Sequence, residues 1–344
     1  MTTLPTSRVP ALRGGPILRW GILAPGGIAR NWASTVLANT DQPIIAVAGR
    51  NPIRAAEFAA ELGIHRVHPT IDGLLADPDI DAIYVASTNE LHRPHALAVI
   101  AAGKHVLVEK PIGCSAAEAR EIAAAARAAG VFAMEAMWTS FLPQTDVVTQ
   151  LVADGELGRP VALVAEFTHR IDPTAGHRVH VGTIGGGALL DLGVYPIAFA
   201  HHLLGPIDSF DANGSLTANG VDATTSLSLR HASGGLTSAL VSLETEGPWA
   251  ATLLGTDGRV EWPIAFFAAG SFRFVPQHGE PVEYFDPNGL VMHEGLCYPA
   301  VAMAGLVAEG RMESPQHTLE DAAAVLEVID ETRRRIGAIA PTEG

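Results

Sequence analysis

Two polar residues that could do chemistry, Glu109 and Lys110, follow directly on an apolar run in the segment VEKPIGCS (residues 108–115). If that run is a strand of an open parallel sheet, both side chains lie at its carboxyl end, the edge where such sheets bind ligands. A lysine at this edge can hydrogen-bond a substrate hydroxyl or stabilise a developing alkoxide. The same residues also suit an exposed Glu–Lys pair beside a turn proline, so the segment by itself leaves both interpretations open.

A second polar cluster follows the apolar run before it, in the segment ASTNELHRPH (residues 86–95). The loop expected here would lie beside the same cleft, where Thr88, Asn89 and His92 could contact a dinucleotide. Thr88 or Asn89 could equally cap the helix that follows. The segment therefore supplies three candidate cofactor ligands and leaves a purely structural role open for two of them.

The segment RWGILAPGGIAR (residues 19–30) has the layout of a dinucleotide-binding turn between a strand and a helix. Two adjacent glycines let backbone amides approach a pyrophosphate, and a small residue after them lets the helix pack on the strand. Ala24 stands where the first glycine is expected, a mild departure, and Pro25 removes one amide donor. Its position after a first strand favours a cofactor site over a purely structural turn. The predicted cofactor residues of the turn are Gly26, Gly27, Ile28 and Ala29.

The end of the second predicted strand, AVAGRN, bears on which dinucleotide binds. An NAD site places an acidic residue there for the ribose 2′-hydroxyl. In this sequence the first acidic residue after the strand is Glu57. Arg50 and Arg54 instead suit a 2′-phosphate, which a guanidinium can bind through two hydrogen bonds. We predict NADP(H) rather than NAD(H), which stays the alternative if both arginines are merely solvated.

A regular fold must hold these residues in place. The first third of the chain shows a pattern of alternating strands and helices that could do so. Short apolar runs at residues 19–24, 43–50, 81–88, 104–110 and 131–137 read as strands. Amphipathic stretches at residues 27–39, 52–63, 92–103 and 115–130 read as helices, several of them ending at glycine. Apolar strands alternating with helices are typical of a doubly wound parallel sheet covered on both faces.

The pattern changes after residue 140. A helix is expected near residues 143–153, and the strand-like segments that follow alternate and are separated by turn residues. These segments are residues 159–170, 226–230, 236–245, 250–263 and 272–276. With two helices, near Leu189–Leu204 and Leu319–Ile336, they indicate an α+β domain whose mostly antiparallel sheet is open on one face. We predict a flexible extension over residues 1–17, a Rossmann domain over 18–137, and a substrate-binding and oligomerisation domain over 138–344.

Composition narrows the class of protein. The 344 residues are 48% hydrophobic and 17% charged, with a formal net charge of −15, which argues against a nucleic-acid partner. There is no uninterrupted apolar run of membrane-spanning length and no signal-peptide pattern at the N-terminus. The two cysteines, Cys114 and Cys297, suit a reducing compartment as buried, inert thiols. We expect a cytoplasmic protein with no membrane partner.

Several motifs taken in order resemble the glucose–fructose oxidoreductase/inositol dehydrogenase/MocA superfamily. They are GILAPGGIA, STNELHRPHALAVIAAGKHVLVEKP and GGGALLDLGVYP. Together with MEAMWTSFLP and ESPQHTLEDAAAVLEVIDETRRRIG, the last is similar to the branch of dimeric dihydrodiol dehydrogenases and D-xylose dehydrogenases. The resemblance runs from about residue 18 to 337 and implies a sugar or dihydrodiol dehydrogenase.

The resemblance implies that Lys110, Asp191 and Tyr195 form the catalytic site next to the nicotinamide. Spacing adds independently that Asp191 and Tyr195, four residues apart, share a face if their segment is helical. Tyr195 is the favoured acid/base, with a nearby Lys110 ammonium expected to lower its pKa from about 10. Lys110 could be the base instead, with Tyr195 orienting the substrate, and Asp191 could position the substrate or hold Lys110.

Further site residues follow from the resemblance. Trp138 and Phe167 resemble the aromatic residues that line the substrate pocket in this branch. Arg178 lies in a polar loop before the catalytic segment and is expected to contact the substrate or the cofactor. Histidines at five positions invite a metal site, but no carboxylate or cysteine stands at ligand spacing, so none is predicted. These positions are His169, His177, His180, His201 and His202.

The predicted function is hydride transfer between NADP(H) and a secondary alcohol or lactol of a sugar, polyol or trans-dihydrodiol. Two alternatives use the same fold: a glycosidase that oxidises its substrate transiently with bound NAD, and a non-catalytic regulator that senses a dinucleotide. The resemblance also implies a homodimer, or a dimer of dimers, paired through the open sheet, since a bare apolar face would otherwise be exposed.

Overall fold

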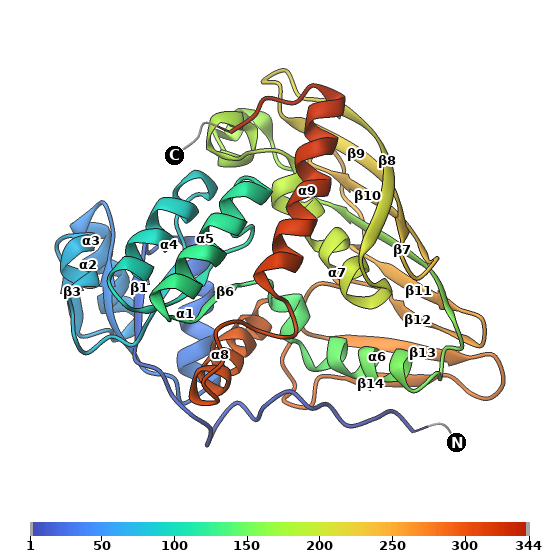
Figure 1. Cartoon of the computed structure of the whole chain (residues 1–344), viewed down its shortest axis with the longest axis horizontal. Coiled ribbons are helices and arrows are strands. Elements are labelled where there is room, and N and C mark those ends of the chain that lie inside the picture. The colour runs from blue at the N-terminus through green and yellow to red at the C-terminus, as the bar shows by residue number, and fades with distance from the viewer. Residues whose placement is uncertain (1–2, 342–344) are drawn as a thin grey trace.

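The chain folds around two β-sheets, one in each half of the sequence (Figure 1). The computed structural model describes residues 3–341. The first two residues of the predicted extension and the last three of the predicted second domain therefore lie outside the described residues.

The first sheet is parallel, with six strands in the order β3-β2-β1-β4-β5-β6. Its strands are β1 (Trp20–Leu23), β2 (Ile44–Ala48), β3 (Arg66–His68), β4 (Ala82–Val85), β5 (His105–Val108) and β6 (Ala133–Glu135). The helices between them are α1 (Gly27–Asn39), α2 (Pro52–Leu62), α3 (Ile71–Leu75), α4 (His92–Ala101) and α5 (Ala116–Ala129). The doubly wound sheet is confirmed, and its strand order reverses between β1 and β4, the crevice where such sheets bind dinucleotides.

The second sheet has eight strands in the order β14-β13-β12-β11-β7-β10-β9-β8. Only the pair of β7 and β10 is parallel, so the predicted mostly antiparallel sheet is confirmed. The strands are β7 (Pro160–Thr168), β8 (Ile207–Leu216), β9 (Asp222–His231), β10 (Leu236–Ser242), β11 (Ala251–Gly255), β12 (Gly258–Trp262), β13 (Ser271–Pro276) and β14 (Val282–Phe285). The helices of this half are α6 (Pro143–Ala153), α7 (Val194–Leu204), α8 (Tyr298–Ala308) and α9 (Leu319–Ile336). Helices α7 and α9 pack on one face of the sheet (Figure 1).

The stretch Gly182–Leu204, which ends in α7, is long and apolar enough by composition alone to cross a membrane. In the structure 83% of its most apolar window is buried inside the fold. Helices in the core of a protein have this composition because every side of them meets apolar neighbours. Burial against the second sheet therefore accounts for its apolar character.

Residues 3–17 differ from the predicted flexible extension, because they contact both domains. The Arg8 guanidinium and backbone amide bind the carboxylate of Asp146 in α6, with Nε at 3.0 Å and the amide nitrogen at 2.6 Å. Further on, Arg13 pairs with Asp41 before β2 at 2.9 Å, and Leu12 is 8% exposed. The segment is therefore held across both domains by ion pairs and a buried leucine, and only its first two residues lie outside the described part.

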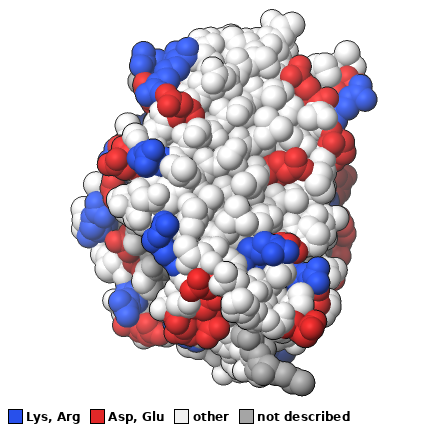
Figure 2. Space-filling model, turned by 90° about the vertical axis from the view of Figure 1, so that its right-hand side faces the viewer, with Lys and Arg blue, Asp and Glu red and all other residues white. Residues whose placement is uncertain are grey.

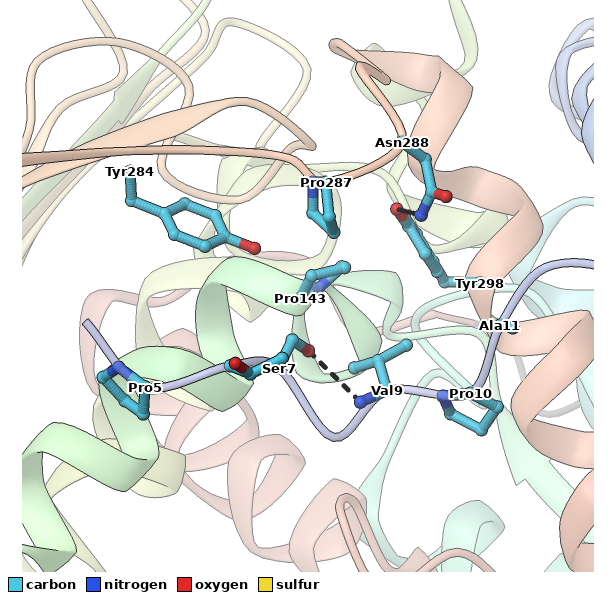
Figure 3. Close-up of a pocket in the computed structure, with 11 residues that line it drawn as sticks. Pro5, Ser7, Val9, Pro10, Ala11, Pro143, Tyr284, Pro287, Asn288 and Tyr298 are labelled. Carbon is cyan, nitrogen blue, oxygen red and sulfur yellow. Dashed lines mark hydrogen bonds between the residues drawn. The ribbon is translucent and has the colours of Figure 1, made fainter. Parts of the chain in front are cut away.

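A cavity of about 330 Å³ lies between this segment and the second domain (Figure 3). Its walls are mainly prolines and two tyrosines, Tyr284 and Tyr298. The Tyr298 hydroxyl donates to Asp286 at 2.8 Å, and the Tyr284 hydroxyl is itself buried. The cavity is thus an apolar gap left where rigid proline rings pack.

The face of the second sheet away from α7 and α9 is open within residues 3–341 (Figure 1). Val164 on β7 is 50% exposed there, and Leu236 and Leu240 on β10 are 44% and 38% exposed. Figure 2 shows that uncharged side chains cover the centre of this side of the molecule, with most charges at its rim. Exposed apolar side chains grouped on a largely uncharged face are typical of an interface.

Candidate active site

A cleft of about 1130 Å³ follows the carboxyl edge of the parallel sheet and is lined by both domains. The turn after β1 and the arginines after β2 line one end, and Lys110, Asp191 and Tyr195 line the other. Of the site residues predicted from the sequence, all but Ala29 line this cleft. Ala29 is fully buried, as a residue that lets α1 pack on the sheet must be.

The turn after β1 fits a pyrophosphate. Gly26 is the N-cap of α1 and no side chain caps the helix, so its first backbone amides are open to a ligand. A Cβ on Gly27 would meet nothing within 4 Å, which leaves space for an approaching group. Ala24 departs from the pattern more than the sequence suggests, because its φ of 68° is in the left-handed region. An alanine pays about 1 kcal/mol or more for a conformation that a glycine adopts freely.

The two arginines lie at the start of α2. Asn51 is the N-cap there, and its Oδ1 accepts hydrogen bonds from the amides of Ile53 and Arg54. This cap fixes the backbone, while the side chains of Arg50 and Arg54 are exposed. Among residues 3–341 no carboxylate forms an ion pair with either guanidinium, so both are open to an anion such as a 2′-phosphate.

The three candidates after β4 are held by the protein itself. Thr88 donates to Glu90 at 2.7 Å, and Asn89 donates from Nδ2 to the carbonyl of Gly185 at 2.8 Å. Neither side chain caps the following turn. The ring nitrogens of the buried His92 contact two carbonyls, Pro111 O at 2.7 Å and Ser87 O at 2.9 Å. Asn89 thus ties the first domain to the second, and His92 braces the loop that follows Lys110.

Lys110 lies between the other two predicted catalytic residues. Its Nζ donates to the backbone carbonyl of Asp191 at 2.8 Å and is 3.6 Å from that residue's Oδ1. The same ammonium lies over the ring of Tyr195, 4.8 Å from its centroid. Asp191 belongs to a π-helical turn, Leu189–Gly193, and Tyr195 follows in α7. The predicted shared face is confirmed, since both residues reach Lys110 and line the cleft.

The charges of this cluster are set by burial and by mutual attraction. Burial disfavours the ammonium of Lys110, but Tyr195 and Asp191 outweigh it and raise the pKa of the lysine. Burial likewise disfavours the Asp191 carboxylate, yet Lys110 and Arg178 hold its pKa below the ordinary value. Lys110 and Asp191 are therefore an ammonium and a carboxylate at neutral pH.

Tyr195 differs from the expectation of a lowered pKa. The Lys110 ammonium does favour the phenolate, but burial acts more strongly in the other direction, and the net effect raises the pKa of Tyr195. The side chain is 7% exposed, and its oxygen accepts one hydrogen bond, from Trp138 Nε1 at 3.1 Å. Tyr195 therefore carries its proton at neutral pH in this chain, and the prediction of a lowered value is wrong.

Two more predicted residues complete the polar part of the site. Arg178 donates to Asp191 Oδ1 at 2.8 Å, so Asp191 lies between two cations. Glu109 is 5% exposed and hydrogen-bonds the hydroxyl of Tyr84, and burial raises its pKa. Its carboxylate also accepts a hydrogen bond from the amide of Lys110 at 3.1 Å, so these contacts hold the end of β5 where Glu109 lines the cleft.

Aromatic rings wall the catalytic end of the cleft. Phe167 stacks on Phe267 with ring centroids 4.2 Å apart, and Tyr195 lies 5.0 Å from the same ring. Trp138 and Trp249 are 6.1 and 6.0 Å from Phe267. The predicted Trp138 and Phe167 are thus joined by Trp249 and Phe267, which the sequence did not single out. Both added residues come from irregular loops with no periodic pattern, so only proximity in the fold identifies them.

The histidines have structural partners. His180 Nε2 contacts the carbonyl of Ile171 at 3.0 Å, His201 pairs with Asp321 at 3.1 Å, and His202 contacts Thr149 at 3.0 Å. Across residues 3–341 no group of three potential metal ligands comes together.

Comparison with known proteins decides the family. Residues 18–137 match the model of an oxidoreductase family with an NAD-binding Rossmann fold, GFO/IDH/MocA, and residues 146–261 match that family's C-terminal domain. The trans-1,2-dihydrobenzene-1,2-diol dehydrogenase of Mus musculus is 32% identical over 335 residues, which cover 95% of this chain and 99% of that protein. The human enzyme of the same name is 30% identical, with the same coverage. The chain belongs to the GFO/IDH/MocA oxidoreductase family. The prediction of an NAD(P)-dependent dehydrogenase acting on CH–OH groups is confirmed by this membership.

Solved structures share the fold of this GFO/IDH/MocA protein. Levoglucosan dehydrogenase in complex with NADH and levoglucosan superposes with a TM-score of 0.83 at 20% identity, covering 93% of this chain and 98% of that one. KijD10, a 3-ketoreductase from Actinomadura kijaniata in complex with NADP and TDP-benzene, has a TM-score of 0.78 at 26% identity and covers 94% and 99%. Relatives of this fold thus bind either dinucleotide.

Proposed function

We propose that this oxidoreductase transfers hydride between NADP(H) and a secondary alcohol or lactol of a cyclic diol, polyol or sugar. One observation carries the proposal: Lys110, Asp191 and Tyr195 converge at the aromatic end of a cleft whose other end presents two exposed arginines, neither in an ion pair within the described residues. The dihydrodiol dehydrogenases at up to 32% identity and the NADP-bound ketoreductase at 26% support it.

The nicotinamide, when bound, supplies or accepts the hydride, and the chain binds and orients both reactants. The open amides at the start of α1 receive the pyrophosphate, and Arg50 and Arg54 the 2′-phosphate. The ring wall around Phe267 packs against the apolar face of the substrate ring. A flat aromatic surface suits the C–H face of a sugar or of a dihydrodiol, so the wall favours cyclic substrates over short linear alcohols.

The proton moves through Tyr195. In reduction of a ketone, the carbonyl carbon gains hydride, and the neutral Tyr195 hydroxyl gives its proton to the carbonyl oxygen. In oxidation of an alcohol, Tyr195 must first lose that proton and then take the one on the substrate hydroxyl. The Lys110 ammonium stabilises negative charge on either oxygen. Asp191, which itself accepts a hydrogen bond from Arg178, holds the ammonium in place.

The first experiment is a fluorescence titration of the protein with NADPH and NADH, followed by turnover of a panel of aldoses, polyols and trans-dihydrodiols. We expect tighter binding of NADPH, lost in Arg50→Gln and Arg54→Gln and kept in Arg127→Gln, an exposed arginine on α5. Equal affinity of the wild type for both dinucleotides contradicts the assignment of the arginines. Glycoside hydrolysis without net reduction of the cofactor contradicts the dehydrogenase, and binding without any turnover favours a regulator.

We also propose a cytoplasmic homodimer. Cys114 and Cys297 are free and buried, and burial raises the pKa of both thiols to about 12, as suits unreactive cysteines in a reducing compartment. The open apolar face of the second sheet supports pairing of two copies. A two-fold axis places the same patch on both partners, so a single self-complementary face suffices.

A further inference from the structure

A buried carboxylate outside the cleft contacts the start of the catalytic segment. Asp222, the first residue of β9, is fully buried and does not line the cleft. Its Oδ2 accepts a hydrogen bond from the amide of Leu189 at 2.5 Å. Leu189 opens the π-helical turn that carries Asp191, and Tyr195 lies six residues further along the same helical stretch. A carboxylate at this place binds the free amides of the helix start and opposes its positive end.

Three glycines, Gly185 to Gly187, precede this stretch and leave room for the Asp222 carboxylate to reach the amide of Leu189. Gly187 has a φ of 115°, and a Cβ there would collide with Asp222. A Cβ on Gly185 would lie 2.8 Å from Cys114 and Asn89, and one on Gly186 would lie 2.9 Å or less from three backbone carbonyls. Without side chains, Gly185 can approach the first domain, Gly186 the loop that carries Arg178, and Gly187 the carboxylate of Asp222.

A cation faces the same carboxylate from the other side. Arg333 of α9 is 4% exposed, and its Nε is 3.8 Å from Asp222 Oδ1. Neither of these two atoms has a hydrogen-bond partner within the described residues. The far end of the guanidinium donates to the carbonyl of Ile339 at 2.6 Å. Arg333 thus balances the charge of Asp222 without a hydrogen bond between the two side chains. The carboxylate accepts its short hydrogen bond from the amide of Leu189, at the start of the helical stretch.

We propose that Asp222 is a positioning residue for hydride transfer: its carboxylate fixes the start of the helix so that Asp191 and Tyr195 face Lys110. The inference rests on the proposed function, because it assumes that these residues do the chemistry. Asp222 has no contact with substrate or cofactor in this role. It sets the register of the π-helical turn, which must deliver a backbone carbonyl and a carboxylate to one ammonium.

The test compares Asp222→Asn with the wild type and with Asp208→Asn, an exposed aspartate on β8. We expect Asp222→Asn to lower kcat by about 10- to 100-fold, since small displacements of catalytic groups have effects of that size. The affinity for NADPH should stay within about twofold, because the cofactor turn belongs to the other domain. Asp208→Asn should change neither quantity.

A double variant separates positioning from stability. Asp222→Asn leaves Arg333 buried without its counter-charge and should lower the melting temperature. Asp222→Asn with Arg333→Met removes both charges and should restore much of the melting temperature, while kcat stays low. Recovery of kcat together with stability means that Asp222 is merely structural, and overturns the proposal. A kcat of Asp222→Asn within about twofold of the wild type overturns it too.

A crystal structure of Asp222→Asn provides a readout that needs no turnover. We expect the helix start to shift and the hydrogen bond between Tyr195 and Trp138, 3.1 Å in the wild type, to lengthen or break. An unmoved helix overturns the inference even if the wild type proves active. A wild type without oxidoreductase activity overturns the proposed function instead, whatever the helix does.

Discussion

At the scale of the residue, the ring and the hydroxyl of Tyr195 have separate roles. The ring packs on Phe267 and faces the Lys110 ammonium, whereas the hydroxyl alone can exchange a proton. Tyr195→Phe keeps the ring and its packing and removes only the hydroxyl. We expect kcat to fall about 10²- to 10⁴-fold, the usual contribution of a positioned acid/base. Steady-state kinetics measures this, with fluorescence titration showing unchanged NADPH affinity.

The matched control is Tyr284→Phe. That hydroxyl is buried with no hydrogen-bond partner among the described residues and lies outside the cleft. Its removal takes a polar atom out of an apolar place, so neither activity nor stability should fall. If Tyr195→Phe behaved like this control, the proton would have to pass through Lys110 instead.

The raised pKa of Tyr195 makes the two directions of the reaction respond oppositely to pH. Reduction needs the protonated hydroxyl, so its kcat/KM should be flat through neutral pH and fall only when the tyrosine ionises in the alkaline range. Oxidation needs the phenolate, so its kcat/KM should rise with pH, about tenfold per unit below that pKa. Profiles of kcat/KM in both directions test this, and an oxidation rate that declines as pH rises from 7 to about 9 contradicts it.

Among single residues, the sequence was most informative where a motif fixes the backbone. The family resemblance assigned Lys110, Asp191 and Tyr195 to one site, and the structure brings them together. Trp249 and Phe267 were missed because their loops reach the cleft from distant parts of the chain. Asp222 could not be found either, because a polar residue opening a strand is common and only the fold places it under Leu189.

At the scale of the element, the turn between β1 and α1 carries strain that its sequence reveals only in part. Ala24 has a φ of 68°, where an L side chain is disfavoured. Ala24→Gly should raise the free energy of unfolding by up to about 1 kcal/mol, since the relief of strain exceeds the added entropy of the unfolded glycine. Thermal or urea unfolding measures the change.

Ala124→Gly is the control for that substitution. Ala124 is exposed in the middle of α5, where glycine should lower the free energy of unfolding by about 1 kcal/mol. Opposite signs for the same chemical change attribute the gain to the left-handed conformation. A loss of stability in both variants contradicts the strain at Ala24.

Strands were predictable where burial produces a short apolar run, and elements were missed where the pattern is absent or fits no single type of element. Strands β1, β4 and β5 are buried almost throughout and read as apolar runs. By contrast, β8 is mostly exposed and lacks the alternation of a half-buried strand. Helix α8 is buried on nearly every side, so its apolar residues show no 3.6-residue period. The three residues of β3 are exposed or half-buried and form no apolar run, whereas the three of β6 are buried and belong to one.

At the scale of the whole molecule, the second sheet separates two surfaces with different roles. Its inner face packs on α7, which carries Tyr195, and its outer face presents Val164 and Leu240 on the neighbouring strands β7 and β10. Val164 and Leu240 are not among the residues that line the cleft. Pairing through the outer face should therefore leave the cleft intact, and we expect assembly and chemistry to be separable.

The variant Val164→Asp with Leu240→Asp tests that separation. A two-fold axis brings the introduced carboxylates of both copies into one apolar interface, where unpaired charges cannot be hydrated, so the dimer should dissociate. Light scattering after size exclusion should show half the wild-type mass, with NADPH affinity retained because the cleft is intact. The control is Ile53→Asp, which places a carboxylate on an apolar residue that is 70% exposed on the first domain and should leave the mass unchanged. A wild type that is already monomeric contradicts pairing through this face, and a double variant that stays dimeric assigns the contact to another surface.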